Sequence, residues 1–521
     1  MSKKLIKSGL VVSVMTLASR VLGLVRDIVI AHLLGAGTAA DVFFFANRIP
    51  NFLRRLFAEG AFNQAFVPVM TEYQRKHGDD EVRELFSRVA GTLGMLVGVV
   101  TIIGMIASPV VSMIFGTGWF LDYLRGGPEA EKFVLASDIL RVTFPYLLFI
   151  TLTAMSGAIL NTRGKFAVPA LTPIFLNLAL IAAALWLAPH MENPEFGLAI
   201  GMVSGGVLQF VFQLPFLKRQ GLLVLPKWGW NHPGVARIRK LMIPALFGVS
   251  VSQVNLLFDT FLASFLATGS ISYLYYSDRL LQFPLGLFGI AIATVILPAL
   301  SRRHVDQSSK QFDQTMDWGV RMVLTLGLPA TVGLVVLSEP LLRVLFMHGE
   351  FSAHEVHMAA RSLHVYSIGL VGFMMVKVLA PGYYARQDTK TPVRFGIIAM
   401  IANMVFNAIL VYPLSYVGLA LATALSGILN AGMLFWGLYR KDVYCPGRAT
   451  AWFVLRLVFA AAVMGGALEY FSPPLEQWVH WSSWHSMMEL SKLIGIGVVS
   501  YLLATLICGI RPVILKAMDE G

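Results

Sequence analysis

The sequence predicts an all-α polytopic membrane protein with about 14 transmembrane helices. Only 13% of its 521 residues are charged and 56% are hydrophobic, whereas a soluble protein of this length carries about 25% charged residues. Apolar runs close to the roughly 20 residues that cross a bilayer recur from end to end. Most of the lysines and arginines behind the net charge of +12 lie in short connectors between these runs.

The apolar runs define the predicted spans in order. The first run follows Lys3, Lys4 and Lys7, as in a signal peptide. Because Arg20 interrupts the run and no small-residue cleavage site follows, we expect it to be retained as a span. Prolines within later spans predict kinks that make room for a cavity. The predicted spans cover residues 9–35, 39–70, 89–115, 133–160, 166–189, 196–217, 240–267, 270–300, 319–346, 359–385, 392–413, 416–438, 450–471 and 488–510.

The connectors predict the orientation in the membrane. If the N-terminus is cytoplasmic, every inside connector is rich in Lys or Arg. The only lysine or arginine residues in the outside connectors are Arg125 and Lys132. This asymmetry is typical of a multi-pass protein, here with both termini in the cytoplasm. Cys445 and Cys508 fall in or beside inside connectors, so no disulfide framework is expected. The inside connectors are 74–88, 161–165, 218–240, 301–310, 386–394 and 439–448.

The chain also contains an internal repeat. Residues 47–68 resemble residues 278–298. The offset of about 230 residues contains six predicted spans, an even number, so the two halves run parallel, as in transporters whose substrate site lies between repeats. We therefore predict an N-lobe of spans 1–6 (residues 1–220), a C-lobe of spans 7–12 (221–445) and two extra helices, spans 13–14 (446–521).

Charged residues inside the predicted spans are the first candidates for function. A charge at mid-membrane costs about 2.5–3.5 kcal/mol on insertion scales, so such a residue usually faces the bundle interior. The cations outnumber the carboxylates, and guanidinium groups match phosphate oxygens, so we predict a cavity for an anionic substrate. The residues are Arg20, Arg26, Asp27, Asp41, Arg48, Arg54, Arg55, Glu59, Asp278, Arg279 and Lys377.

Some of these charges have a plainer interpretation. Arg55, Arg54 and Arg48 could be edge residues, because long basic side chains near a span end reach back to the interface. Asp27 and Asp41 could serve only to neutralise neighbouring arginines. Both interpretations remain open from the sequence.

A second polar set comprises Asp259, Asn403, Asn407 and Thr423. Asn403 and Asn407 are four residues apart and share a helix face. Oxygen ligands of this kind suit a small hard cation, which predicts a sodium site. The alternative is hydrogen bonding between helices.

Motifs for chemistry are missing from the sequence. It has no Gly-rich phosphate loop, paired-carboxylate motif or nucleophile elbow, and no connector is long enough for a catalytic domain, so we do not expect an enzyme. Four histidines near an outside loop lack the spacing of a zinc motif, so no metal site is predicted. The basic residues form no soluble patch with interleaved aromatics, which argues against a nucleic-acid partner.

Four stretches carry a family signature: SRVLGLVRD (19–27), AADVFFFANRIPNFLRRLFAEGAFNQAFVP (39–68), YYSDRLLQFP (275–284) and VKVLAPGYYARQDTKTP (376–392). They resemble the MurJ (MviN) lipid II flippases, of the multidrug/oligosaccharidyl-lipid/polysaccharide exporter superfamily. The resemblance covers essentially the whole chain, and the run around LRRLFAEGAF is specific to that family. It implies two six-helix lobes and a terminal pair that forms a groove for a lipid tail.

The resemblance implies a substrate and its contacts. The substrate would be lipid II, an undecaprenyl diphosphate bearing a disaccharide–pentapeptide, moved from the cytoplasmic to the periplasmic leaflet of the bacterial inner membrane for peptidoglycan synthesis. One departure is Gln282, where some members carry a glutamate, so no titratable acid stands there. The family's required charges fall here on Arg20, Arg26, Asp41, Arg54, Arg279 and Lys377.

The implied mechanism is alternating access. The diphosphate and sugars would settle among the arginines while the polyprenyl tail stays along spans 13–14. Sodium or the inside-negative membrane potential, worth roughly 2.3 kcal/mol per charge per 100 mV, would drive the cycle. We expect a monomer without a cofactor, in contact with membrane lipids and the peptidoglycan synthesis machinery. The alternatives are a flippase for another polyprenyl-linked oligosaccharide and a cation-coupled drug exporter.

Overall fold

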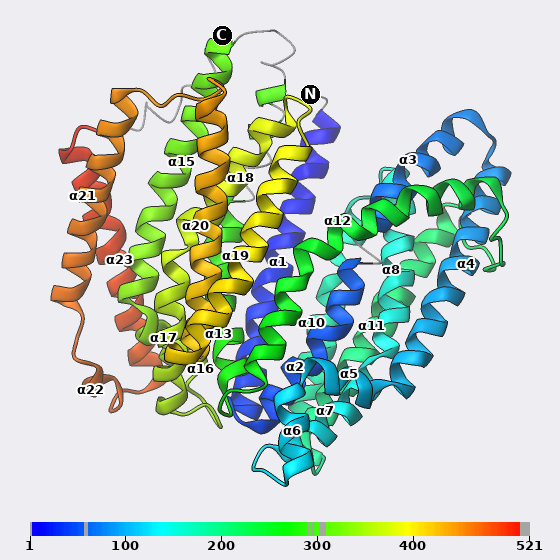
Figure 1. Ribbon diagram of the computed structural model, residues 1–521, viewed down its shortest axis with the longest axis horizontal. Helices are drawn as coiled ribbons and strands as arrows, with labels where there is room; N and C mark the ends of the chain where they lie inside the picture. The colour runs from blue at the N-terminus through cyan, green and yellow to red at the C-terminus, as the bar shows by residue number, and fades with distance from the viewer. Residues whose placement is uncertain are drawn as a thin grey trace. The chain divides into compact units, whose positions relative to one another are not determined.

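The computed structural model describes residues 3–56, 61–289 and 309–510, together with the positions 292, 296, 297 and 299–301. Every regular element in these ranges is a helix (Figure 1). Ten helical segments among the described residues, some of them broken into shorter pieces, are long and apolar enough to cross a membrane. The prediction of an all-α polytopic membrane protein is confirmed.

The other four predicted spans coincide with helices that carry charged candidates. Span 2 contains α2 and α3 on either side of residues 57–60, which include Glu59 and lie outside the described residues. Span 8 begins as α13 and continues as the π-helical turn η4. The bounds are α1 (Lys3–Leu34), α2 (Thr38–Arg54), α3 (Ala61–Lys76), α12 (Pro233–Ala263), α13 (Ser270–Pro284) and η4 (Leu285–Gly289).

The chain divides into two compact units. The first comprises Met1–Ser272 and His348–Phe351, and the second comprises Tyr273–Met347 and Ser352–Gly521. Helix α12, predicted to open the C-lobe, lies in the first unit, because its apolar face packs along α3. The lobe boundary predicted at residue 220 therefore differs from the boundary of the compact units. It rests on the internal repeat and stays a prediction.

The first unit has a core of large apolar side chains. A buried cluster joins α3, α4, α8, α11 and α12 and includes Phe62, Phe66, Leu85, Leu147 and Ile159. A Cβ on Gly91 of α4 would overlap the Lys227 carbonyl, so the connector before α12 lies directly on α4. The remaining helices are α4 (Asp79–Ile106), α5 (Ser108–Phe115), α6 (Thr117–Arg125), α7 (Ala130–Thr143), α8 (Pro145–Thr162), α9 (Ala167–Leu171), α10 (Pro173–Ala182), η2 (Ala183–Leu187), η3 (Ala188–His190) and α11 (Pro194–Arg219).

In the second unit, the two helices beyond the predicted repeat, α21 and α23, lie side by side and pack against α15 (Figure 1). Buried Leu457, Leu468 and Leu493 form their core, with Leu324 and Val332 of α15 against it. The helices of this unit are α15 (Ser309–Val336), α16 (Ser338–Phe346), α17 (Ala353–Ile368), α18 (Leu370–Tyr384), α19 (Lys390–Leu414), α20 (Tyr416–Arg440), α21 (Arg448–Phe471), α22 (Leu475–Trp478) and α23 (Ser483–Ile507).

The internal repeat is visible in where the helices break. Helices α4 and α15 end 230 positions apart, at Ile106 and Val336. Each is followed, after a single residue, by a short helix, α5 or α16. The next span is also broken in both halves, into α7–α8 and α17–α18. Pro145 opens α8, where its missing N–H and fixed φ suit a helix start. Each of these four predicted spans therefore consists of two helices.

Candidate functional site

Six charged residues are predicted to bind substrate, and each compact unit holds part of the set. Arg20 and Lys377 make no hydrogen bond or ion pair within the part of the chain that the structure describes. Cations on apolar helices without a protein partner are well placed to take an anion from outside the protein. The first unit holds Arg20, Arg26, Asp41 and Arg54, and the second holds Arg279 and Lys377.

Arg26 is held from two sides. Its Nε and Nη2 donate to Oδ1 of Asp27 at 3.0 and 2.7 Å, and its Nη1 donates to Oδ1 of Asn177, on α10, at 2.9 Å. Asn177 in turn donates to the carbonyl of Ser19 at 3.1 Å. Because Asp27 is buried against the guanidinium, it neutralises part of the Arg26 charge. The contacts join α1 to α10 around Arg26.

The arginines at the end of α2 reach polar groups. Arg48 Nη1 donates to Oγ1 of Thr260 on α12 at 2.9 Å, and Arg55 Nη1 donates to a glutamine of the same helix at 3.0 Å. Arg54 donates to Oδ1 of Asn51 at 3.2 Å, within α2. Arg48 and Arg55 thus join α2 to α12, which favours a structural role for both over contact with substrate.

On α13, the Arg279 guanidinium lies against Tyr275. Its carbon is 4.8 Å from the ring centroid, and Nη2 donates to the tyrosine hydroxyl at 3.0 Å. One turn further on, Gln282 Nε2 lies 3.3 Å from Oδ1 of Asp278 and donates to it. A glutamate at position 282 would place a second carboxylate there, so the amide suits the Asp278 side chain. Lys377 of α18 borders η4, in the same unit.

Asp41 is buried, and both of its carboxylate oxygens are occupied. Oδ1 accepts from N and Oγ of Ser272 at 3.0 and 2.7 Å, and Oδ2 accepts from Gly269 N at 2.7 Å and Lys132 Nζ at 3.3 Å. Asp41 therefore caps the N-terminus of α13, where a negative charge is favourable. This geometry favours the positioning of α13 over the substrate contact predicted for Asp41.

Three of the four residues of the predicted sodium site lie in the second unit. Asn407 Nδ2 donates to Asn403 Oδ1 at 3.0 Å, and Asn403 Nδ2 donates to Ser426 Oγ at 3.2 Å. Thr423 donates to the backbone of its own helix. These contacts join α19 to α20, which is the hydrogen bonding between helices expected as the alternative. Asp259 lies on α12 in the first unit.

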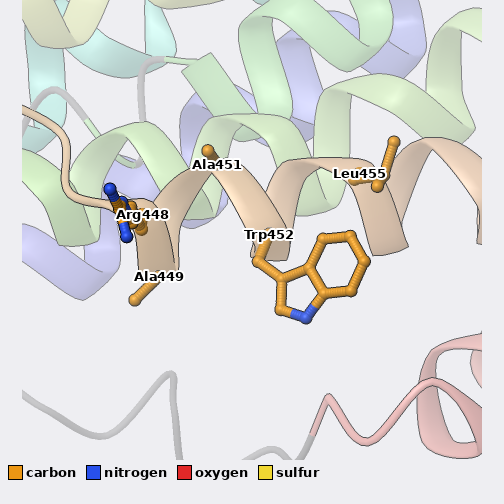
Figure 2. Close-up of a pocket in the computed structure, with 5 residues that line it drawn as sticks. All are labelled: Arg448, Ala449, Ala451, Trp452 and Leu455. Carbon is orange, nitrogen blue, oxygen red and sulfur yellow. The ribbon is translucent and has the colours of Figure 1, made fainter.

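The extra helix α21 presents an apolar surface. An open pocket lies along its first turns, and its tryptophan and leucine are 57% and 56% exposed (Figure 2). At the same end, Asp317 of α15 accepts hydrogen bonds from Tyr444 at 2.9 Å and Thr450 at 2.6 Å and pairs with Arg321. This network fixes α21 to α15. The pocket is lined by Arg448, Ala449, Ala451, Trp452 and Leu455.

Comparison with known proteins identifies the family. The family model described as lipid II flippase MurJ matches residues 30–488. A protein named probable lipid II flippase MurJ from Vibrio cholerae is 62% identical over 519 residues, which are 100% of this chain and 99% of the relative. This chain belongs to the MurJ family. The lipid II flippase MurJ of Burkholderia cenocepacia is 40% identical over 472 residues, 89% of this chain and 90% of the relative.

Solved structures agree with the MurJ assignment. A lipid II flippase MurJ in an inward closed conformation matches with a TM-score of 0.80 and 27% identity, over 98% of this chain and 100% of that chain. An inward-facing multidrug resistance MATE transporter of the MOP superfamily shares the fold at 13% identity, with a TM-score of 0.68 over 82% of this chain and 98% of that chain. The MurJ resemblance seen in the sequence is confirmed.

One buried charged residue, Lys132, lies outside the four sequence stretches that resemble the MurJ family. The sequence predicts Lys132 in an outside connector, and the structure corrects this, because Lys132 lies in the first turn of α7 with a side chain only 2% exposed. Outside connectors rarely carry lysine, so its position was the one available signal. Its partner Asp41 is 91 residues away, beyond the reach of local patterns.

Proposed function

We propose that this protein moves lipid II from the cytoplasmic to the periplasmic leaflet of the bacterial inner membrane for peptidoglycan synthesis. It is a transporter and not an enzyme. Two lines support the proposal: proteins named lipid II flippases resemble the chain along its whole length, and Arg20, on the first predicted span, has no partner among the described residues. A polyprenyl diphosphate supplies the anion that such a cation requires.

In this proposal the cations hold the diphosphate. Arg20, Arg26, Arg54 and Arg279 bind phosphate oxygens through their planar N–H groups, and Lys377 adds a point charge. The polyprenyl tail stays in lipid along α21 and α23. Alternating access of the two lobes then exposes the sugars and peptide to the other side, with no bond made or broken.

The driving force follows from the same charges. When the carrier is empty, the membrane potential attracts its excess of buried cations toward the negative, cytoplasmic side. Each charge gains about 2.3 kcal/mol per 100 mV. We propose the membrane potential as the driving force and sodium as the alternative. Collapsing the potential at constant sodium, and removing sodium at constant potential, separate the two in proteoliposomes.

We propose that both termini lie in the cytoplasm. We also propose that the carrier is a monomer and that it contacts the peptidoglycan synthesis machinery. The basic inside connectors support this orientation. Labelling of single cysteines placed at positions 78 and 127, with a membrane-impermeant reagent on intact cells, tests it. Only position 127 is expected to react.

Depletion in the native cell tests the function. We expect peptidoglycan synthesis to stop while lipid II accumulates in the cytoplasmic leaflet. Continued peptidoglycan synthesis with loss of a surface polysaccharide would identify another polyprenyl-linked substrate instead. Normal envelope synthesis with increased drug sensitivity would identify a drug exporter.

A further inference from the structure

Lys132 is a buried cation outside the proposed phosphate-binding set. Its Nζ lies 3.3 Å from Asp41 Oδ2 and 2.5 Å from Glu129 Oε2. The same atom is 5.4 Å from the centroid of the buried Trp119 ring. Burying an ammonium away from water costs free energy, and these three groups offset that cost.

Both carboxylates that Lys132 bridges hold the segment between α12 and α13. Asp41 caps α13, as described above, and Glu129 Oε1 accepts a hydrogen bond from Thr268 Oγ1 at 2.6 Å. The segment is therefore bound from α2 through Asp41 and from just before α7 through Glu129. Lys132 is the group that these two carboxylates share.

The charge balance shows what Lys132 does for the cap. Asp41 is buried and Glu129 is partly buried, and two carboxylates that share one cation repel one another. Without Lys132, no cation of the cluster would compensate this repulsion, and the contacts of both carboxylates with the segment between α12 and α13 would weaken.

We propose that Lys132 is a positioning residue for transport, which holds Asp41 and Glu129 in place and thereby keeps the start of α13 bound to α2. Arg279 lies seven residues after Ser272 on α13, about two helical turns. Lys132 acts on the substrate only through this helix. The inference rests on the proposed function, because it concerns the same transport step.

The test uses the full-length protein in proteoliposomes, with lipid II carrying a fluorescent label. For Lys132→Met we expect lipid II binding within about twofold of wild type and transport slower by at least about tenfold. Lys132→Arg, which keeps the charge, should recover transport to within about threefold. Arg125→Met is the matched control, because Arg125 is an exposed cation at the end of α6, and it should behave like wild type.

A merely structural lysine would give a different pattern. Transport by Lys132→Met within about twofold of wild type would overturn the inference, and so would a parallel loss of binding and transport. If Lys132→Met does not accumulate, the double variant Asp41→Asn with Lys132→Met keeps the net charge of the cluster. Slow transport by this folded variant supports the inference, and full transport overturns it. Failure of the wild-type protein to transport lipid II would instead reject the proposed function.

Discussion

The guanidinium of Arg279 stacks on the ring of Tyr275 and donates to its hydroxyl at 3.0 Å, one helical turn earlier on α13. Stacking and hydrogen bond together fix the plane of the guanidinium. A planar fork held in this way loses little freedom when it binds a phosphate, whereas an ammonium has no plane to fix. In the proposed function, Tyr275 therefore orients Arg279 for the diphosphate.

Arg279→Lys is expected to slow lipid II transport by at least about tenfold, because a point charge cannot replace two parallel N–H contacts. Tyr275→Phe keeps the stacking and loses one hydrogen bond, so its effect should stay within about threefold. Transport by proteoliposomes with matched protein amounts measures both. Full activity of Arg279→Lys together with Arg279→Ala would remove Arg279 from the phosphate-binding set.

Asp27→Asn separates neutralisation from positioning at Arg26. We expect the free energy of unfolding to fall by about 1–3 kcal/mol, because the guanidinium loses charge-assisted hydrogen bonds. Lipid II affinity should stay within about twofold, since Asn177 still orients Arg26. Thermal unfolding in detergent and a lipid II binding titration measure the two effects. An affinity loss beyond about tenfold would mean that Asp27 itself sets the position of Arg26.

Gly91→Ala is expected to destabilise the first unit by about 1–3 kcal/mol, because its Cβ would overlap the Lys227 backbone. That connector cannot move away freely, since Lys227 N donates to the Ser87 carbonyl at 3.0 Å. Gly98→Ala is the matched control in α4, with no atom within 4 Å of its Cβ. Thermal unfolding should show a lower Tm for the first variant alone. Equal Tm values for the two variants would mean that the connector before α12 does not lie directly on α4.

Asp388 gives a pH dependence outside the membrane. Hydrogen bonds from Thr391 Oγ1 at 2.7 Å and Thr391 N at 3.0 Å, with Lys441 beside them, hold the pKa of Asp388 below its usual value of 3.8. A carboxylate more acidic in the folded chain adds stability above the unfolded pKa and loses it as the pH falls through the folded pKa. Asp388→Asn should therefore lower the free energy of unfolding at pH 7 by at most about 1 kcal/mol.

The measurement for Asp388 is the Tm of both proteins across a pH series. The difference between wild type and Asp388→Asn should shrink as the pH is lowered and vanish once Asp388 is protonated in both states. A difference that stays constant with pH would assign the effect to the Thr391 contacts alone.

Hydropathy and loop charge predicted most of the fold, because a bilayer forces each span to be long and apolar. They could not predict the breaks at Ala107 and Leu337, because each depends on how a short following helix packs. The energetic cost of a charge inside the bilayer also singled out Arg20 and Arg279 as candidates for function. It missed Lys132, whose burial is visible only when α7 is folded against α2.

The polar contacts of the terminal helices have a consequence for how they stay attached. Lipid tails are as apolar as leucine, so separating α21 and α23 from α15 exposes apolar side chains to the bilayer at little cost in free energy. Attachment then depends on Thr450 bonded to Asp317 and on Tyr501, whose hydroxyl donates to the Thr325 carbonyl at 2.8 Å. Sliding the pair by one turn would break both bonds at once and leave the apolar contact almost unchanged. The helices α21 and α23 therefore pack against α15 in one register. Any surface that they provide for the lipid tail lies at a fixed depth in the membrane.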